Sequence, residues 1–507
     1  MSGWPCWARW AARTSRWWAL LLALGAGALL PFAFAPFNLW PLAIVCPTLL
    51  MCLWQAVTPR RGALLGFCFG VGLFTAGTWW LYISIHGFGA APLWLSALLI
   101  MVLVGVMASY YALLGALSVK LLPAAGIWRW CGGLPAFWLL IEWWRGWFLS
   151  GFPWLSLGYS QTDTWLAGFA PVIGVYGLSA LLLLQAGALT AFWQARGRAR
   201  LLPLVLIPVA WVGGWGLGHI AWTRPVGAPV QIAILQGAIP QDEKWQISNR
   251  EPTRALYRQL NDQALGARLI LWPEAAIPEL ANDFPRYLAQ IQASARSHDS
   301  DVVMGVVRLG DNGVDYYTSI LALTSGVAFY DKRHLLPFAE YFPVPPFVRS
   351  WLRLLSLPYS DFRAGAKDQP PLQAGGMRLA PSICYEDAFA SAQLALAGHS
   401  ELLVNVTNDA WFGRSPARYL HLQISRMLAL EVGRFLLRAA NDGVSAIIGP
   451  KGELVAVAPE YQSAVLRGTV VPRDGLSPYI RFGNWPVLLL AFGAAAAAYR
   501  RLRPAPA

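Results

Sequence analysis

The chain has 507 residues and a formal net charge of +13, yet 56% of its residues are hydrophobic and only 13% are charged. A soluble chain usually carries about 25% charged residues, so the composition excludes an ordinary soluble globular protein. The positive charge does not indicate nucleic-acid binding, because residues 223–482 hold 25 Lys and Arg against 24 Asp and Glu.

Seven apolar runs precede residue 222 and an eighth follows residue 483. Each is close to the roughly 20 residues that a helix needs to span the hydrocarbon core of a membrane. We therefore expect a membrane bundle of eight transmembrane helices, seven in residues 1–222 and the eighth in residues 483–507. The first run also resembles a signal peptide, with arginines, an apolar stretch and Ala33-Phe34-Ala35, but Pro36 directly after it argues against cleavage. The runs are 17–34, 38–56, 62–84, 92–118, 131–149, 165–192, 201–221 and 484–499.

Basic residues lie in every second loop of this predicted bundle. The intervening loops at 35–37, 85–91 and 150–164 contain no Lys or Arg. Basic loops stay on the cytoplasmic side, so both termini are expected there and residues 223–482 are expected to face outward. The basic residues are Arg9, Arg13, Arg16, Arg60, Arg61, Lys120, Arg129, Arg196, Arg198, Arg200, Arg500, Arg501 and Arg503.

One carboxylate and one guanidinium, Glu142 and Arg145, fall inside the fifth apolar run. Ionisable residues within a membrane usually have a function. Both residues are close to the outer end of the run, so a pair that snorkels to the interface is the alternative.

Residues 223–482 alternate short β-branched runs with amphipathic stretches, which is typical of an α/β domain. Neighbouring runs that read as hairpins predict a mixed sheet rather than a purely parallel one. The predicted strands are Val230–Leu235, Arg268–Trp272, Asp301–Val307, Tyr317–Leu323, Val327–Tyr330, Arg378–Ile383, Leu402–Val406, Ala446–Ile448 and Leu454–Val457. The predicted helices cover about 250–264, 283–297, 386–397 and 416–433.

Polar residues follow several of these predicted strands, and one of them is Cys384, the only cysteine of residues 223–482. A cysteine acts as a nucleophile only as the thiolate, which requires a base or a cation nearby. In open α/β sheets, ligands gather beyond the carboxyl ends of strands. If the strand ends converge, Glu274 would take the proton of Cys384. Lys332 would favour the thiolate and stabilise an oxyanion.

Each of these residues also has an ordinary structural explanation. Cys384 could be a small buried apolar side chain, and Glu274 could cap a turn or helix. Lys332 beside Arg333 could be a solvated surface pair. No single residue decides between the two interpretations.

The order of these residues along the chain, together with their neighbours, is a more specific signal than any one of them alone. Pro273-Glu274, then Lys332-Arg333-His334-Leu335 with Pro337 to Tyr341, then Cys384-Tyr385-Glu386 resemble the Glu–Lys–Cys motifs of the nitrilase superfamily. With the eight apolar runs, the whole chain resembles the apolipoprotein N-acyltransferase family, a membrane-bound branch of that superfamily. Further matching motifs are Gly151-Phe152-Pro153-Trp154, Gln236-Gly237, Lys244-Trp245 and Thr407-Asn408-Asp409-Ala410-Trp411-Phe412-Gly413.

The resemblance implies a nitrilase-like αββα sandwich in residues 223–482, joined to the helical bundle. It implies that Cys384 is the nucleophile, Glu274 the general base and Lys332 the electrostatic stabiliser. It assigns supporting or substrate-binding positions to Glu340, Glu386, Tyr385, Trp245 and Trp411.

The implied reaction has two halves. Cys384 takes an acyl chain from a phospholipid, typically phosphatidylethanolamine, as a thioester. The N-terminal amine of an S-diacylglyceryl-cysteine apolipoprotein then receives it. The implied location is the bacterial inner membrane, with a periplasmic catalytic domain and with no cofactor, metal or nucleic acid. A membrane-tethered nitrilase-type amidohydrolase and a non-catalytic lipoprotein scaffold are the alternatives. Formation of acyl-Cys384 would distinguish the acyltransferase from both.

Overall fold

A computed structural model describes residues 16–122, 126–194, 201–341 and 362–500. The chain divides into a helical unit (1–82, 93–220 and 482–507) and an α/β unit (83–92 and 221–481). Several of the basic residues used to predict the topology, including Arg9, Arg196 and Arg503, lie outside the described residues.

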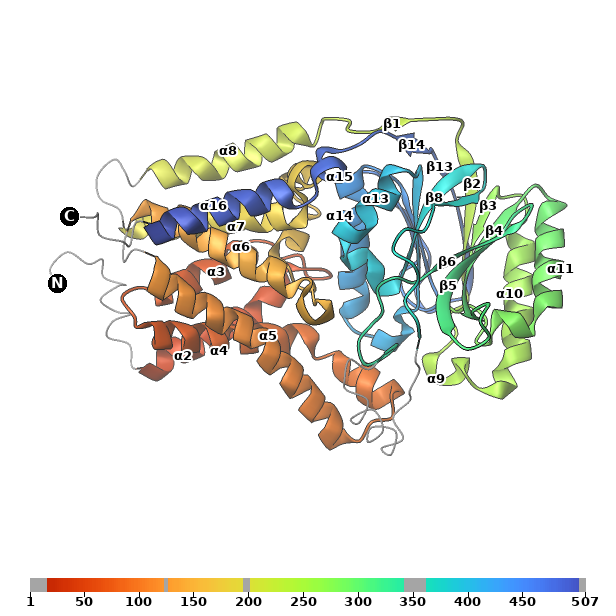
Figure 1. The fold of residues 1–507 in the computed structure, drawn as a ribbon, viewed down its shortest axis with the longest axis horizontal. Helices are drawn as coiled ribbons and strands as arrows, with labels where there is room; N and C mark the ends of the chain where they lie inside the picture. The colour runs from red at the N-terminus through yellow and green to blue at the C-terminus, as the bar shows by residue number, and fades with distance from the viewer. Residues whose placement is uncertain (1–15, 123–125, 195–200, 342–361, 501–507) are drawn as a thin grey trace. The chain divides into compact units, whose positions relative to one another are not determined.

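The helical unit has one helix overlapping each of the eight predicted apolar runs. These helices are α2 (Arg16–Leu29), α3 (Leu42–Leu53), α4 (Pro59–Thr78), α5 (Leu93–Leu121), α6 (Leu134–Arg145), α7 (Ala170–Gln194), α8 (Leu202–Leu217) and α16 (Trp485–Arg500). Shorter 3₁₀ segments include η1 (Leu30–Ala33), η5 (Leu157–Gln161) and η6 (Trp165–Phe169). Figure 1 shows α2 to α7 and α16 lying side by side as a bundle.

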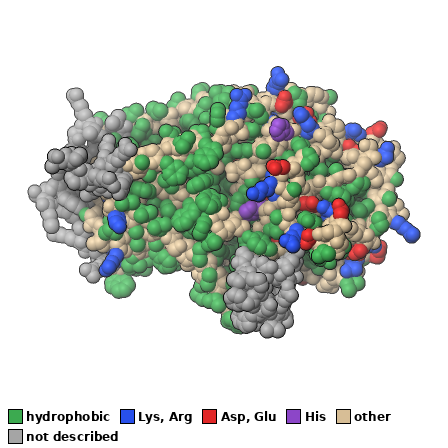
Figure 2. Space-filling model, in the orientation of Figure 1, with side chains coloured by type: hydrophobic (Ala, Val, Ile, Leu, Met, Phe, Trp, Pro, Cys, Tyr) green, Lys and Arg blue, Asp and Glu red, His purple; other side chains and the backbone are tan. Residues whose placement is uncertain are grey.

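Within the described residues, three helical stretches are both long and apolar enough to cross a membrane. They are Pro59–Thr78, Leu93–Leu121 and Trp165–Trp193. Four others are apolar but shorter: Trp17–Ala33, Leu42–Leu53, Val205–Leu217 and Trp485–Ala498. The crossing of all eight helices therefore stays a prediction. Figure 2 shows hydrophobic side chains covering one face of this unit, as a lipid environment favours.

Backbone-to-backbone packing joins the helices at small residues. A Cβ atom on Gly66 of α4 would lie 2.0 Å from the carbonyl oxygen of Tyr111 on α5. A Cβ atom on Gly72 would lie 2.0 Å from the carbonyl oxygen of Leu24 on α2. Such close approach is how small residues hold helices together where no hydrophobic effect drives their association.

The Glu142 and Arg145 side chains do not snorkel, since they are only 2% and 1% exposed. Arg145 donates to the carbonyl oxygens of Phe152 and Trp154, the latter at 2.7 Å. Glu142 accepts hydrogen bonds from the Ser179 hydroxyl and the Leu157 N–H. The two charges therefore fix the loop that contains Gly151 to Trp154, and the snorkelling alternative is wrong.

The α/β unit contains two six-stranded mixed sheets, as the sequence predicts. The first has the order β13 (Ala464–Val470), β2 (Val230–Gln236), β3 (Leu269–Leu271), β4 (Asp301–Leu309), β5 (Tyr316–Leu323) and β6 (Val327–Asp331). The second has the order β12 (Leu454–Val457), β11 (Ala446–Ile448), β10 (Leu436–Ala440), β9 (Leu402–Thr407), β8 (Met377–Ile383) and β7 (Leu372–Ala374). Strands β2, β3 and β4 are parallel, as are β8, β9 and β10.

Two pairs of helices enclose the sheets. Helices α10 (Arg250–Ala264) and α11 (Pro285–Arg296) cover the first sheet, and α13 (Ala390–Gly398) and α14 (Ala417–Val432) cover the second (Figure 1). Apolar side chains of both sheets form one buried core between them. A second core lies between the first sheet and α10 and α11. The αββα layering implied by the resemblance is confirmed.

Several features of the α/β unit differ from the prediction. Strands β7, β10 and β13 of the two sheets were not expected. Strand β10 carries Arg438 in its middle, and a charged residue obscures the pattern of a buried strand. The helix expected over 386–397 is broken: a 3₁₀ turn, η10 (Cys384–Ala388), ends at Phe389, and α13 begins after it.

Candidate active site

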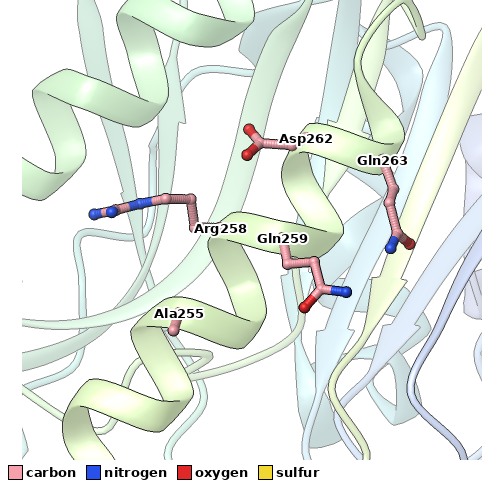
Figure 3. A pocket seen from close by; sticks show the side chains of 5 residues that line it. All are labelled: Ala255, Arg258, Gln259, Asp262 and Gln263. Carbon is pink, nitrogen blue, oxygen red and sulfur yellow. The ribbon is translucent and has the colours of Figure 1, made fainter.

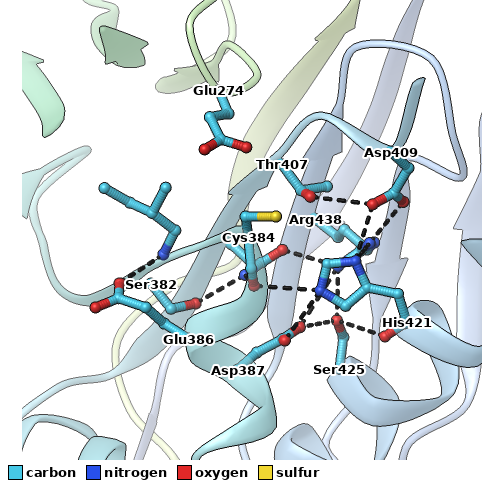
Figure 4. Close-up of polar contacts among 12 residues, drawn as sticks. Glu274, Ser382, Cys384, Glu386, Asp387, Thr407, Asp409, His421, Ser425 and Arg438 are labelled. Atoms are coloured by element: carbon cyan, nitrogen blue, oxygen red, sulfur yellow. Dashed lines mark hydrogen bonds and ion pairs between the residues drawn. The ribbon is translucent and has the colours of Figure 1, made fainter. Parts of the chain in front are cut away.

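Glu274, Lys332 and Cys384, which were predicted to lie at strand ends, all follow strands of the α/β unit. Glu274 comes three residues after β3, Lys332 directly after β6, and Cys384 directly after β8. The Lys332 Nζ atom lies 3.9 Å from Glu274 Oε1. In Figure 4 the Glu274 carboxylate lies on the same side as the Cys384 sulfur. The structure thus brings together the three residues that the sequence motifs single out.

Cys384 occupies a sharp turn between β8 and η10. Its φ angle is 51°, in the left-handed region that residues other than glycine seldom adopt. Such strain persists only where surrounding contacts impose it, and it concentrates at functional sites. A strand-to-helix turn of this kind presents a nucleophile beyond the end of a sheet. Cys384 is partly exposed, whereas the adjacent Ile383 and Tyr385 are buried.

Lys332 is held as an ammonium group between two carboxylates. Its side chain is 2% exposed, and Nζ donates to Glu340 Oε1 at 2.7 Å. Burial lowers the pKa of Lys332, but the charges of Glu340 and Glu274 outweigh burial and raise it above its ordinary value. A permanent positive charge therefore stands beside Glu274 and Cys384.

Glu274 is a better proton acceptor than an ordinary carboxylate. Burial raises its pKa, and the nearby charges of Glu340 and Asp409 raise it further, while Lys332 and Lys244 oppose this. Lys244 is fully buried, and its Nζ atom donates to the backbone carbonyl oxygen of Glu274 at 3.3 Å. The motif Lys244-Trp245 drew attention to this segment, but only the structure shows that the lysine points inward.

Lys332 favours the thiolate of Cys384, as expected, but its charge does not outweigh burial. Burial raises the pKa of the Cys384 thiol and Glu274 raises it further, whereas Lys332 and a hydrogen bond from Thr407 lower it. The net direction is upward, so the resting group is the thiol. A reaction at the sulfur therefore requires a base to remove this proton, and the Glu274 carboxylate lies on the same side as the sulfur (Figure 4).

Glu386 ties the Lys332 segment to the Cys384 turn. Its carboxylate accepts hydrogen bonds from the backbone N–H groups of Ile383 at 2.8 Å, Arg333 at 2.7 Å and His334 at 3.1 Å. The second supporting carboxylate, Glu340, accepts from the Leu336 N–H at 2.7 Å as well as from Lys332. Glu340 thus contacts the Lys332 ammonium, whereas Glu386 contacts the backbone after Lys332 and before Cys384.

The three aromatic residues assigned by resemblance lie in different surroundings. Tyr385 is 7% exposed, and its ring centroid is 5.0 Å from that of Phe389. Trp245 and Trp411 are 50% and 39% exposed. Trp411 contacts the segment 83–92, whose Ser84 hydroxyl donates to the Trp411 carbonyl at 2.7 Å. A role for these rings in binding substrate stays a prediction.

A surface depression of about 520 Å³ lies elsewhere on the α/β unit. Exposed side chains along one face of α10 line it, as Figure 3 shows. The opposite face of α10 packs on the first sheet, so this depression does not lead to Cys384. The lining residues are Ala255, Arg258, Gln259, Asp262 and Gln263.

Sequence comparisons agree with this arrangement. Residues 26–188 match the family described as "Apolipoprotein N-acyltransferase N-terminal domain", and residues 231–474 match "Carbon-nitrogen hydrolase". The chain is 41% identical to the apolipoprotein N-acyltransferase of Methylococcus capsulatus, over 96% of each chain. It is 42% identical to that of Nitrosomonas europaea, over 95% of this chain and 98% of the relative. The corresponding protein of Azotobacter vinelandii is 41% identical, over 98% of this chain and 99% of its own. The chain therefore belongs to the apolipoprotein N-acyltransferase family.

Proposed function

We propose that this chain moves a fatty acyl group from a phospholipid to the N-terminal amine of an S-diacylglyceryl-cysteine apolipoprotein, through a thioester on Cys384. The observation that carries the proposal is the position of Glu274 and Lys332 beside a partly exposed thiol at the ends of three strands. Membership of the family, over nearly the full chain, supports the same reaction.

In the first half-reaction the Cys384 proton passes to Glu274 while the sulfur attacks the ester carbonyl carbon. The Lys332 ammonium and the backbone N–H of Tyr385 stabilise the oxyanion. The carbon–oxygen bond then breaks, and the lysophospholipid alcohol leaves with the proton from Glu274. The products are acyl-Cys384 and a lysophospholipid.

In the second half-reaction the α-amine of the apolipoprotein attacks the thioester. Glu274 removes a proton from the attacking nitrogen, and Lys332 again stabilises the tetrahedral oxyanion. The carbon–sulfur bond breaks, and the thiolate recovers its proton from Glu274. The triacylated lipoprotein leaves, and the free thiol is regenerated.

We also propose roles for the residues around the triad and a location for the chain in the cell. Glu340 and Glu386 hold Lys332 and the Cys384 turn, and Tyr385, Trp245 and Trp411 contact the acyl chain or the lipid headgroup. Residues 1–222 and 483–507 provide the eight membrane crossings. They place residues 223–482 on the periplasmic side of the inner membrane, with both termini in the cytoplasm. Phosphatidylethanolamine is the preferred donor.

The test uses the purified full-length chain with vesicles of phosphatidylethanolamine of defined chain length. We expect mass spectrometry to find that acyl chain on the Cys384 peptide, together with an equimolar amount of lysophospholipid. Cys384→Ala should form neither product, whereas Cys131→Ala, which removes another of the free cysteines, should form both. Hydrolysis of small amides without an acyl adduct would instead favour the amidohydrolase alternative.

A further inference from the structure

A cluster of buried charges lies directly beneath the Cys384 turn, and the two half-reactions do not use it. We call it the His421 cluster; its members are Asp387, Asp409, His421, Ser425 and Arg438, each no more than 1% exposed (Figure 4). Its side chains come from η10, from α14, from β10 and from the segment after β9. Buried charges are retained only where they are paired, so their gathering at this turn requires an explanation.

The contacts of His421 favour its protonated form. Nδ1 lies 2.8 Å from Asp409 Oδ1 and 2.9 Å from Arg438 Nη2, and Nε2 lies 3.1 Å from Asp387 Oδ1, so each ring nitrogen has a carboxylate within hydrogen-bond distance. Burial and Arg438 lower the pKa of His421, but the two carboxylates outweigh them and raise it to about 9. His421 is therefore positively charged near neutral pH.

Arg438 is the second cation of the cluster, and it pairs with Asp409. Its Nη2 donates to Asp409 Oδ2 at 2.7 Å, and its Nη1 donates to the Ser425 hydroxyl at 2.8 Å. Ser425 in turn donates to Asp387. Two cations thus face two carboxylates, and the cluster is neutral only while His421 carries its proton.

The cluster reaches the Cys384 backbone through one carbonyl. The Cys384 carbonyl oxygen lies 3.2 Å from His421 Nε2 and 3.2 Å from Asn405 Nδ2. Arg438 orients Asn405, since its Nη1 donates to Asn405 Oδ1 at 2.8 Å. The Nε2–H of His421 is shared between this carbonyl and Asp387, and Asn405 donates to the carbonyl as well. The carbonyl of a residue with a strained φ angle is therefore held by two side chains, one in the cluster and one that Arg438 orients.

The cluster also reaches the sulfur. The Thr407 hydroxyl lies 3.1 Å from Asp409 Oδ1, and Figure 4 shows it beside Cys384. The Thr407 hydroxyl can rotate so that its hydrogen points to the Cys384 sulfur instead of Asp409 when the thiolate forms. Asp409 loses little by this, because His421 and Arg438 still donate to it.

We propose that the His421 cluster is a positioning device for the nucleophile. It holds the Cys384 carbonyl so that the sulfur faces Glu274 and Lys332, and it stays electrically neutral so that thiolate formation meets no uncompensated negative charge. The inference rests on the proposed function only in taking Cys384 as the acyl carrier. Glu386 holds the turn from the other side, through the Ile383 N–H.

The test measures the rate at which iodoacetamide alkylates Cys384 at fixed pH, by mass spectrometry of its peptide in the full-length chain. His421→Gln removes one positive charge and leaves a net negative cluster. We expect alkylation to slow by at least about tenfold, the effect of raising a thiol pKa by one unit. The same variant should slow acyl-Cys384 formation on the order of 100-fold, since misplacing a reacting group by about 1 Å costs that much.

A double variant separates charge from packing. His421→Gln combined with Asp387→Asn removes one charge of each sign and restores neutrality. We expect it to recover most of the lost alkylation rate. A loss that the double variant does not recover would show that the neutrality of the cluster does not set the reactivity of Cys384, and it would overturn the proposal. So would an unchanged rate in His421→Gln.

Arg434→Gln is the matched control. Arg434 is as buried as Arg438, but it donates to the carbonyl oxygens of Ser400, Val432 and Gly475, away from the cluster. Its alkylation rate should equal that of the unaltered chain. If His421→Gln does not fold, Thr407→Val serves instead, because it removes the hydroxyl alone; a rate equal to that of the unaltered chain would overturn the proposal. Failure of the proposed function looks different, since the unaltered chain would then form no acyl-Cys384.

Discussion

The Lys332 ammonium lies 2.7 Å from one oxygen of Glu340, closer than to the carboxylate of Glu274 at 3.9 Å. Glu340 is therefore the direct hydrogen-bonded partner of the lysine. The second oxygen of Glu340 accepts the Leu336 N–H, which fixes the carboxylate in place. This difference in distance agrees with the proposed roles, in which Glu340 holds Lys332 and Glu274 receives the proton.

The first prediction concerns Glu340→Gln. The amide keeps the size of the side chain but removes the charge beside Lys332, so the ammonium is free to swing toward Glu274. We expect the rate of acyl-Cys384 formation to fall on the order of 100-fold, because the lysine no longer points at the oxyanion. Single-turnover acylation measures this. Glu251→Gln, on the exposed side of α10, should leave the rate unchanged.

A second prediction follows from the raised pKa of Glu274. The carboxylate must be ionised to act as a base, so the acylation rate falls as pH drops through its pKa. Because burial raises that pKa, the loss should occur above the value near 4.3 that is usual for a glutamate. We expect Glu274→Gln to remove this dependence and to leave a thiol that alkylates slowly near neutral pH.

The control for Glu274→Gln is Glu279→Gln. Glu279 is also largely buried and pairs with Arg254 at 2.7 Å, but it does not contact Cys384, Lys332 or Glu340 among the described interactions. Its variant should keep the pH dependence of the unaltered chain. An unaltered profile in Glu274→Gln would show that another group accepts the proton.

A third prediction links His421 to stability. Its pKa in the folded chain is about 9, above the value near 6.5 expected in the unfolded chain. The proton therefore stabilises the fold fully below about pH 6.5, and this contribution is lost as pH rises toward the folded pKa. The difference corresponds to roughly 3 kcal/mol. Thermal unfolding in detergent should show a lower melting temperature at alkaline pH, and His421→Gln should flatten that slope.

The sequence predicts most of the α/β unit because its strands are apolar and short. The runs of β2, β4, β8 and β9 are continuous stretches of buried residues, typical of strands covered on both faces. Strand β10 was missed because Arg438 interrupts such a run. Its charge is acceptable there only because Asp387 and Asp409, distant in sequence, pair with it.

The residues of the candidate site likewise fall into those that the sequence predicts and those that only the structure reveals. The convergence of Glu274, Lys332 and Cys384 could be predicted because each follows a predicted strand and lies in a recognisable motif. Lys244 lies in a matching motif but does not follow a predicted strand, and His421 has neither signal. The importance of both depends on burial that the chain acquires only on folding. The protonation state of Cys384 could not be predicted from the sequence either, because it depends on the balance between burial and the opposite charges of Glu274 and Lys332.

The last prediction concerns Lys244, whose pKa burial lowers to about 8 although Glu274 opposes this. Its positive charge favours the ionised form of Glu274, and its hydrogen bond holds the Glu274 backbone. Lys244→Met keeps the apolar stem and removes the charge, so the pKa of Glu274 should rise. The acid limb of the acylation profile should then move to higher pH by about one unit, roughly a tenfold loss of rate on that limb. Lys367→Met, at an exposed position, should leave the profile in place. A lower rate with an unmoved limb would mean that Lys244 only supports the backbone of Glu274.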